Sequence, residues 1–171
     1  GWRNIDGKWY YLTTDGARMG DQNLDGKLYY FDPVNGDMKT GWISNPGYTG
    51  TEWNYYDPVS GEKATGWRNI DGKWYYFLHH ALKGFQKIGD KSYYFDPVNS
   101  DMKTGWISKQ GKTYYFDPAN CDLKTGWLEL NGRKYYADPN DGGAFASNKT
   151  LVIDGVSYTF GIDGSVINNE P

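Results

Sequence analysis

Tryptophan recurs in closely spaced pairs along this chain of 171 residues, which contains 8 tryptophans and 16 tyrosines. The clearest pairs are Trp2 with Trp9, Trp42 with Trp53, and Trp67 with Trp74. The face of an aromatic ring attracts a quaternary ammonium ion, which needs no hydrogen-bond donor from the protein. Ring faces also stack against the C–H groups of a sugar, although a sugar site requires polar side chains as well. The rings therefore indicate a binding site for one of these two ligand classes.

The tryptophans belong to a repeat of about 20 residues, which reads as a strand after Gly-Trp, a turn, and a strand ending in Tyr-Tyr. Repeats of this length are typical of architectures in which neighbouring copies stack. The predicted units cover about residues 1–19, 20–40, 41–65, 66–83, 84–104, 105–125 and 126–148, with a terminal cap at 149–171. The opening stretch GWRNIDGKWYY returns unchanged at Gly66, and DPVNGDMKTGWIS from Asp32 returns as DPVNSDMKTGWIS from Asp96. Units one to three thus form a block that was copied as units four to six.

Each unit carries a strong hairpin signal, because Asp-Gly or Asn-Gly between aromatic runs tolerates positive φ at both turn positions. These turns are Asp6-Gly7, Asp25-Gly26, Asp71-Gly72, Asn131-Gly132 and Asp154-Gly155. Unit three has a longer loop, SNPGYTGTE, and a second loop such as DPVNGDMKTGW follows most hairpins. In that second loop Pro and Gly end the strand while Asp and Asn supply turn hydrogen bonds.

The predicted fold is all-β, a β-solenoid of about eight stacked hairpins that forms one module over residues 1–171. A single two-stranded hairpin is marginal in water, whereas stacked hairpins bury their aromatic faces against one another. Strand side chains alternate, so Trp9 and Tyr11 share one face and Tyr10 takes the other. The middle tyrosines are therefore predicted to be structural: Tyr10, Tyr29, Tyr75, Tyr93, Tyr114 and Tyr135.

Composition and charge argue against several other classes of protein. The chain is 38% hydrophobic and 18% aromatic, with a net charge of −3 and no run of Lys or Arg. Nucleic-acid binding usually needs a basic stripe, so that class is set aside. No apolar run approaches the length of a membrane-spanning helix. A lone Cys121 excludes an internal disulfide and a thiolate metal cluster, and its expected role is that of a small turn residue.

Catalysis is also disfavoured, because the carboxylates recur at turn positions where hydrogen bonding to the loop backbone explains them. These repeated carboxylates are Asp6, Asp32, Asp57, Asp96 and Asp117. His79 and His80 are adjacent, so on a strand they would face opposite ways and make a poor metal pair. DPVNGD lacks the spacing and terminal Glu of a calcium loop. We therefore predict no catalytic residue, no metal and no cofactor.

The stretches GWRNIDGKWYYLTTDGARM and GWRNIDGKWYYF resemble the choline-binding repeat of pneumococcal and phage cell-wall proteins, and the resemblance spans almost the whole chain. It implies that the hairpins stack into a left-handed β-solenoid. Choline would lie between successive hairpins, boxed by the Gly-Trp tryptophan, the first aromatic residue of WYY, and the last Tyr of the next hairpin's WYY. A methionine often closes such a box.

Transferred to this sequence, the resemblance implies three complete boxes. They are Trp2, Trp9 and Tyr30, closed by Met19; Trp42, Trp53 and Tyr76; and Trp67, Trp74 and Tyr94. The boundary after unit six offers Trp106 and Tyr136, with Thr113 in place of the second tryptophan. This boundary, the boundaries after units two and five, and that of Trp127 with Lys134 and Thr159 are expected to be empty or weak. Met38 and Met102 are expected to pack beside these boundaries, as ligand contacts or as gap fillers.

The resemblance implies a non-catalytic, extracellular module that binds choline or phosphocholine units of teichoic and lipoteichoic acids and anchors its owner to the bacterial cell wall. An attached wall hydrolase, a homodimer through the terminal hairpins, and a host molecule as partner are left open by the sequence. Neither nucleic acid nor membrane insertion is expected. The alternative is a glucan-binding repeat of the glucosyltransferase or clostridial-toxin type, which GKLYY, KTYYF and RKYYA resemble.

Overall fold

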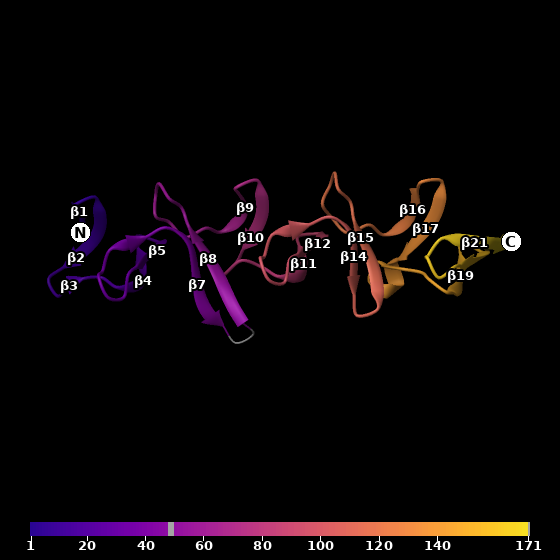
Figure 1. Ribbon diagram of the computed structural model, residues 1–171, viewed down its shortest axis with the longest axis horizontal. Helices are drawn as coiled ribbons and strands as arrows, with labels where there is room; N and C mark the ends of the chain where they lie inside the picture. The colour runs from indigo at the N-terminus through magenta and orange to yellow at the C-terminus, as the bar shows by residue number, and fades with distance from the viewer. Residues whose placement is uncertain (48–49, 171) are drawn as a thin grey trace. The chain divides into compact units, whose positions relative to one another are not determined.

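The structure is a computed structural model that describes residues 1–47 and 50–170 (Figure 1). Within these residues the chain forms eight antiparallel hairpins, one in each predicted unit. Hairpins 1 to 4 are β1–β2 (Trp2–Ile5, Lys8–Thr13), β4–β5 (Gly20–Leu24, Lys27–Phe31), β7–β8 (Gly41–Gly47, Gly50–Tyr56) and β9–β10 (Gly66–Ile70, Lys73–Phe77). Hairpins 5 to 8 are β11–β12 (Gly84–Ile88, Lys91–Phe95), β14–β15 (Gly105–Lys109, Lys112–Phe116), β16–β17 (Gly126–Leu130, Arg133–Asp138) and β19–β20 (Lys149–Ile153, Val156–Phe160).

Short strands in the second loops pair with several of these hairpins. They are β3 (Gly16–Ala17), β6 (Met38–Lys39), β13 (Met102–Lys103), β18 (Ala144–Phe145) and β21 (Val166–Glu170). A 3-10 turn, Pro139–Asp141, precedes β18. The element content of the described residues confirms the predicted all-β class.

The hairpin turns have the predicted backbone conformation. Asp6 and Gly7 have φ of 51° and 77°, and the other four predicted turns repeat positive φ at both positions. This conformation matches the right-handed twist of the flanking strands, which is why Asp-Gly and Asn-Gly stand there. The longer loop of unit three includes residues 48 and 49, which lie outside the described residues.

The second loops are held by their first aspartate, as the sequence predicts for Asp32, Asp57 and Asp117. In the loop of hairpin 3, the Asp57 carboxylate accepts hydrogen bonds from the backbone N–H groups of Val59 and Ser60, each at 2.8 Å. Asp32 and Asp117 accept the equivalent pairs of hydrogen bonds. Cys121 lies in such a loop with φ of 65°, in agreement with its expected role.

The chain divides into two compact units, each of which is described by itself. The N-terminal unit contains Gly1–Leu82 with Val98–Asp101, and the C-terminal unit contains Lys83–Pro97 with the chain from Met102 onward. The predicted single module over residues 1–171 and the left-handed superhelix stay predictions.

Within each unit the hairpins stack through one row of buried side chains at the end of the second strand. Phe31, Tyr56 and Phe77 form this row in the N-terminal unit, and Phe95, Phe116 and Phe160 hold the same positions in the C-terminal unit. Backbone hydrogen bonds connect successive hairpins, as from Lys63 N–H to the Leu28 carbonyl and from Leu123 N–H to the Ser92 carbonyl. Such neighbour-to-neighbour packing is the predicted stacking of hairpin repeats.

Among the described residues, no helix has the length and apolar character required to cross a membrane.

Candidate functional site

The contact between hairpin n and hairpin n+1 is called seam n below. In the stretch Trp9-Tyr10-Tyr11 and its equivalents, the three residues are called the first, middle and last ring positions. In seam one the rings of Trp2 and Trp9 lie 6.4 Å apart between centroids and nearly perpendicular, at 81°. Tyr11 pairs with Trp2 across the hairpin, with ring centroids 5.4 Å apart. Hairpin 2 adds Tyr29, whose ring centroid is 5.0 Å from that of Trp2.

The rings of seam one open onto a cavity of about 330 Å³, to which three successive hairpins contribute. Hairpin 1 supplies Trp2 and Trp9, and hairpin 2 supplies Tyr29 and Met38. Val59 and Ser60 reach the same cavity from the second loop of hairpin 3. Beside them, Gly61 leaves room for Met38, since a Cβ on Gly61 would lie 2.4 Å from the Met38 sulfur. The cavity is therefore closed by a loop that lies two hairpins further along the chain.

Seam three repeats the ring geometry of seam one. Trp42 and Trp53 have centroids 6.4 Å apart at 90°, and Trp42 lies 5.1 Å from its cross-strand partner Tyr55. The ring that hairpin 4 contributes is Tyr75, with its centroid 4.8 Å from that of Trp42. Seams one and three thus share one arrangement, a perpendicular tryptophan pair joined by a tyrosine of the next hairpin. The perpendicular pair is called a tryptophan corner below.

The structure corrects which tyrosine meets the tryptophan pair. Tyr30 and Tyr76 were expected in the first two boxes, but the middle ring positions Tyr29 and Tyr75 contact Trp2 and Trp42 instead. Tyr76 packs on Trp67 of its own hairpin, at 5.1 Å. The physical reason is that side chains alternate along a strand. Tyr29 lies two residues before the buried Phe31 and shares its face, toward the preceding seam. Tyr30, at the last ring position, faces the following seam. Tyr29 and Tyr75 were predicted to be structural, and they are both buried and part of the seams.

Met19 is also placed differently from the prediction. Its side chain is 47% exposed, and it is Met38 that lines the cavity with Trp2 and Trp9. Met38 stands opposite Phe31 in β6, so the strand pairing carries it to the seam. It therefore takes the closing position that the resemblance implies for a methionine.

The third predicted box is divided between the two units. Trp67 and Trp74 again lie 6.4 Å apart at 80°, so hairpin 4 presents the same tryptophan corner. Tyr94 belongs to the C-terminal unit, where its ring lies 5.0 Å from its cross-strand partner Phe85. A box of Trp67, Trp74 and Tyr94 stays a prediction.

Seam six replaces the missing tryptophan by a ring that the sequence analysis did not consider. Trp106 lies 4.8 Å from Phe145, 4.9 Å from Tyr115 and 5.7 Å from Tyr135, measured between centroids. Tyr136, which was expected here, packs on Trp127 at 5.0 Å, so the same one-residue shift applies. This seam contains a cavity of about 300 Å³, which is lined by Trp106, Thr113, Tyr135 and Phe145. Asp163 and Ile162, from the loop after β20, close it.

The sequence contains one indication that a ring such as Phe145 is needed in seam six. Hairpin 7 carries Ala137 at the row position where hairpins 2 to 6 and hairpin 8 carry Phe or Tyr, and Ala137 pairs with Phe145 in β18. The small Ala137 side chain, which is fully buried, leaves space that the Phe145 ring can use. An alignment of the repeats shows that hairpin 7 lacks a large side chain at this position. It does not show that Phe145, from the following loop, takes that place.

Seams two and five contain polar or charged protein groups in place of tryptophans. In seam two the buried Tyr56 hydroxyl donates a hydrogen bond of 2.8 Å to Asp21, which stands at the Gly-Trp position. Burial, followed by the Asp21 carboxylate, strongly raises the pKa of Tyr56, so the phenol keeps its proton. In seam five the ammonium of Lys109 lies 5.1 Å from the centre of the Phe85 ring. The expectation that these seams are empty or weak stays a prediction.

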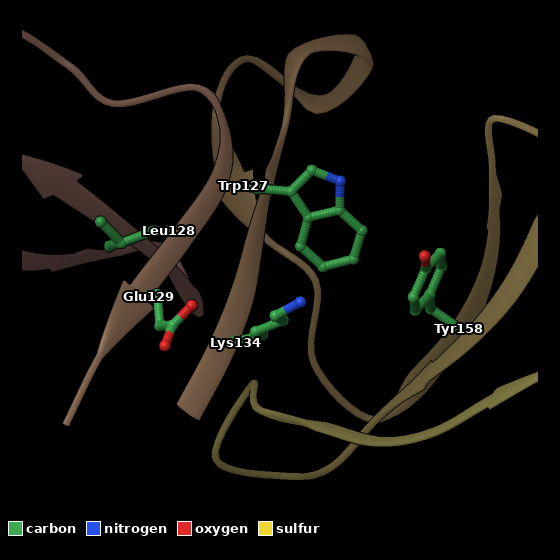
Figure 2. Close-up of a pocket in the computed structure, with 5 residues that line it drawn as sticks. All are labelled: Trp127, Leu128, Glu129, Lys134 and Tyr158. Carbon is green, nitrogen blue, oxygen red and sulfur yellow. The ribbon is translucent and has the colours of Figure 1, made fainter. Parts of the chain in front are cut away.

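Seam seven combines rings with the charged side chains of Glu129 and Lys134 (Figure 2). Trp127 and Tyr158 have centroids 4.7 Å apart, and with Leu128, Glu129 and Lys134 they line a cavity of about 330 Å³. Two like charges 4 Å apart repel by about 4 kcal/mol near a protein surface. One cation–π contact contributes only about 0.5–2 kcal/mol. The Lys134 ammonium therefore opposes a cation in this seam, and the expectation that the seam is empty or weak stays a prediction.

Comparison with known proteins identifies the family of these repeats. The family model of the choline-binding repeat matches residues 1–42, 20–66 and 82–125. The chain belongs to the choline-binding repeat family. A model of the cell wall binding repeat matches residues 65–78 and 125–142 as well. The predicted resemblance is thus confirmed, and with it the function class of a choline-binding cell-wall module. No curated protein matches the chain significantly.

Solved structures of pneumococcal proteins share the fold of these choline-binding repeats. Choline binding protein F from Streptococcus pneumoniae, solved in the presence of a peptidoglycan analogue, has a TM-score of 0.82 and 34% identity. CbpJ from Streptococcus pneumoniae TIGR4 has a TM-score of 0.81 and 35% identity. Each match covers 98% of this chain and 57% of the other. The autolysin LytC of the same species, at 21% identity, shares the fold, with a TM-score of 0.63, 99% of this chain covered and 42% of the other.

Proposed function

We propose that the chain is a non-catalytic module that binds choline at its tryptophan corners and thereby attaches its owner to choline-bearing polymers of the cell wall. The observation that supports this most directly is the repeated corner itself, a perpendicular tryptophan pair with centroids 6.4 Å apart in hairpins 1, 3 and 4. A repeated ring geometry without a repeated hydrogen-bonding group suits a quaternary ammonium ion, which is attracted by ring faces alone.

The proposed choline sites are those seams in which the corner is completed by the next hairpin. They are seam one with Trp2, Trp9, Tyr29 and Met38, seam three with Trp42, Trp53 and Tyr75, and seam six with Trp106, Tyr135 and Phe145. Trp67 and Trp74 offer a further tryptophan corner. Phosphocholine units of teichoic and lipoteichoic acids are the proposed partners, and the proposed location is the outer face of the cell.

The expected strength of one site follows from its rings. Three desolvated contacts of about 2 kcal/mol each, less the cost of immobilising the ligand, leave about 4–5 kcal/mol. That free energy corresponds to about millimolar affinity. Several such sites on one polymer gain factors of about 10² to 10⁴ through effective concentration. Copying the hairpin block thus multiplies weak sites into an anchor.

A calorimetric titration with choline tests this proposal, with an isomaltooligosaccharide as the control ligand. We expect saturable, millimolar choline binding that Trp9→Ala reduces by one site, because Trp9 is 46% exposed and its loss removes one wall of seam one. Leu28→Ala is the matched control, since Leu28 holds the same position in hairpin 2 without a tryptophan partner. Sugar binding without any choline response, or an equal loss in both variants, would contradict the proposal.

A further inference from the structure

The cavity of seam seven is lined by one ammonium and one carboxylate that have no partner among the residues that the structure describes. Over residues 1–47 and 50–170 the structure gives the side chains of Lys134 and Glu129 neither an ion pair nor a hydrogen bond, whereas Arg133 is paired with Asp163. Lys134 and Glu129 stand opposite each other in the β16–β17 register, so they share a face. Trp127 lies on the same face, two residues before Glu129.

The two charges are placed differently relative to the rings. Figure 2 shows the Lys134 side chain extending toward the space between Trp127 and Tyr158, while Glu129 lines the same cavity from the neighbouring strand. Trp127 remains 37% exposed, so one part of its ring is open to a ligand. The seam therefore offers a ring face, a hydrogen-bond donor and a hydrogen-bond acceptor around one cavity.

Neither a cation nor an anion suits this combination. A cation against the rings would meet the like charge of Lys134 at short range, and Coulomb repulsion there outweighs the attraction of one ring face. An anion would be attracted by Lys134, but it would face Glu129 and the negative faces of the rings. The charges of Lys134 and Glu129 cancel, which leaves a neutral ligand without any such penalty.

A hydroxyl group uses both charges, since it donates to a carboxylate and accepts from an ammonium. Hydrogen bonds to charged groups are among the stronger ones in proteins. A ligand that presents several hydroxyls around an apolar C–H face is a sugar in its ring form. We propose that seam seven binds a neutral sugar ring, stacked on Trp127 and hydrogen-bonded by Lys134 and Glu129.

This site differs in ligand class from the choline corners and does not depend on them. At the first ring position, seams one and three carry Trp9 and Trp53, where seam seven carries Lys134. The polar substitution that weakens a cation site thus supplies the donor that a sugar requires. The chain would then hold two ligand classes in different seams.

Fluorine NMR of protein labelled with 5-fluorotryptophan tests the proposal, because each of the 8 tryptophans gives its own signal. Trp127→Phe assigns the Trp127 signal. The probes are isomaltotriose, tri-N-acetylchitotriose, choline and inorganic phosphate. We expect at least one of the two sugars to shift the Trp127 signal at millimolar concentration, and we expect choline and phosphate to leave it in place.

Lys134→Met and Glu129→Gln should each weaken the sugar response roughly tenfold, because each removes one charged hydrogen-bonding group. Lys87→Met is the matched control, since Lys87 is an exposed lysine of another hairpin in the same unit, and it should change nothing. No shift of Trp127 with either sugar would overturn the proposal, as would a shift with choline or phosphate, or a sugar response that survives both variants. Loss of choline responses at the other tryptophan signals would contradict the proposed choline sites instead, so the two failures are distinguishable.

Discussion

At the residue scale, the side chain at the Gly-Trp position is matched to the one that the next hairpin presents. Where this position is Trp42, the next hairpin presents Phe77, with ring centroids 5.8 Å apart. Where it is Asp21, the next hairpin presents Tyr56, whose hydroxyl donates to the carboxylate. A buried hydroxyl without a partner would cost free energy, so the tyrosine requires the aspartate. Such matched pairs let seam two stack without forming a tryptophan corner.

Single aspartates also set how the second loops respond to acid. The backbone N–H groups of Ser60 and Val59 hold the pKa of Asp57 below its ordinary value, because their hydrogen bonds favour the charged carboxylate. A folded-state pKa below the unfolded value stabilises the fold above about pH 4. That contribution is lost as the pH falls through the folded-state pKa. Asp32 and Asp117 have the same direction of shift and the same cause.

Asp57→Asn should therefore reduce the amount by which the free energy of unfolding falls when the pH is lowered from 6 to 3. The amide oxygen still accepts the loop hydrogen bonds, but it does not titrate in this range. Urea unfolding followed by circular dichroism at both pH values measures the difference. Asp6→Asn is the control, since within the described residues the Asp6 carboxylate accepts no hydrogen bond, and Asn-Gly suits the same turn. An equal acid-induced loss in wild type and Asp57→Asn would count against this explanation.

At the element scale, the second loops connect hairpins that are not adjacent in the chain. The loop after hairpin 3 closes the cavity of seam one, and the loop of hairpin 8 closes that of seam six in the same way. Ion pairs accompany these loops, from Lys27 to Glu62 and from Arg133 to Asp163. Exposed pairs of this kind contribute about 0–1 kcal/mol each, so they align neighbours more than they stabilise them.

Gly61→Ala should disturb both the loop and the proposed choline site in seam one. Gly61 has φ of 75°, and its new Cβ would overlap the Met38 sulfur that lines the cavity. Gly7→Ala is the matched control, because Gly7 has φ of 77° but open space around it. The left-handed conformation alone costs about 1–2 kcal/mol in either variant. Urea unfolding should show a larger loss for Gly61→Ala, and calorimetry should show weaker choline binding for that variant alone; equal behaviour of the two would contradict the role given to Met38.

The sequence predicts the hairpins well, because their signals are local. Asp-Gly turns and alternating aromatic residues determine each hairpin without reference to its neighbours. The partner rings could not be derived in this way, since Tyr29 and Tyr30 are adjacent in the chain and only the stacking decides which one faces Trp2. Met38 and Phe145 reach their seams through the pairing of β6 and β18, which follows from register and not from the repeat pattern.

At the scale of the whole molecule, we expect the strength of attachment to depend on how many corners bind choline together. The N-terminal unit contains the complete corners of seams one and three, and the C-terminal unit contains the ring cluster of seam six, which has a single tryptophan. Each corner alone is expected to bind at about millimolar strength. The chain spans 57% of the length of choline binding protein F.

Avidity gives a prediction at this scale. On a surface that presents choline densely, the module should bind at least about 100-fold more tightly than free choline binds in solution, because the later contacts are intramolecular. Trp9→Ala should reduce this surface affinity by roughly tenfold or more, although it removes only one site. Surface plasmon resonance on choline-bearing and bare surfaces measures both quantities. Surface affinity no better than that for free choline would contradict the multivalent anchor.

The most direct test is a crystal structure of the module grown in choline. The account predicts choline in the corner of Trp2, Trp9 and Tyr29 and in that of Trp42, Trp53 and Tyr75, with none over Phe85 or Trp127. Choline beside Tyr30 and Tyr56, or its absence from both tryptophan corners, would contradict it.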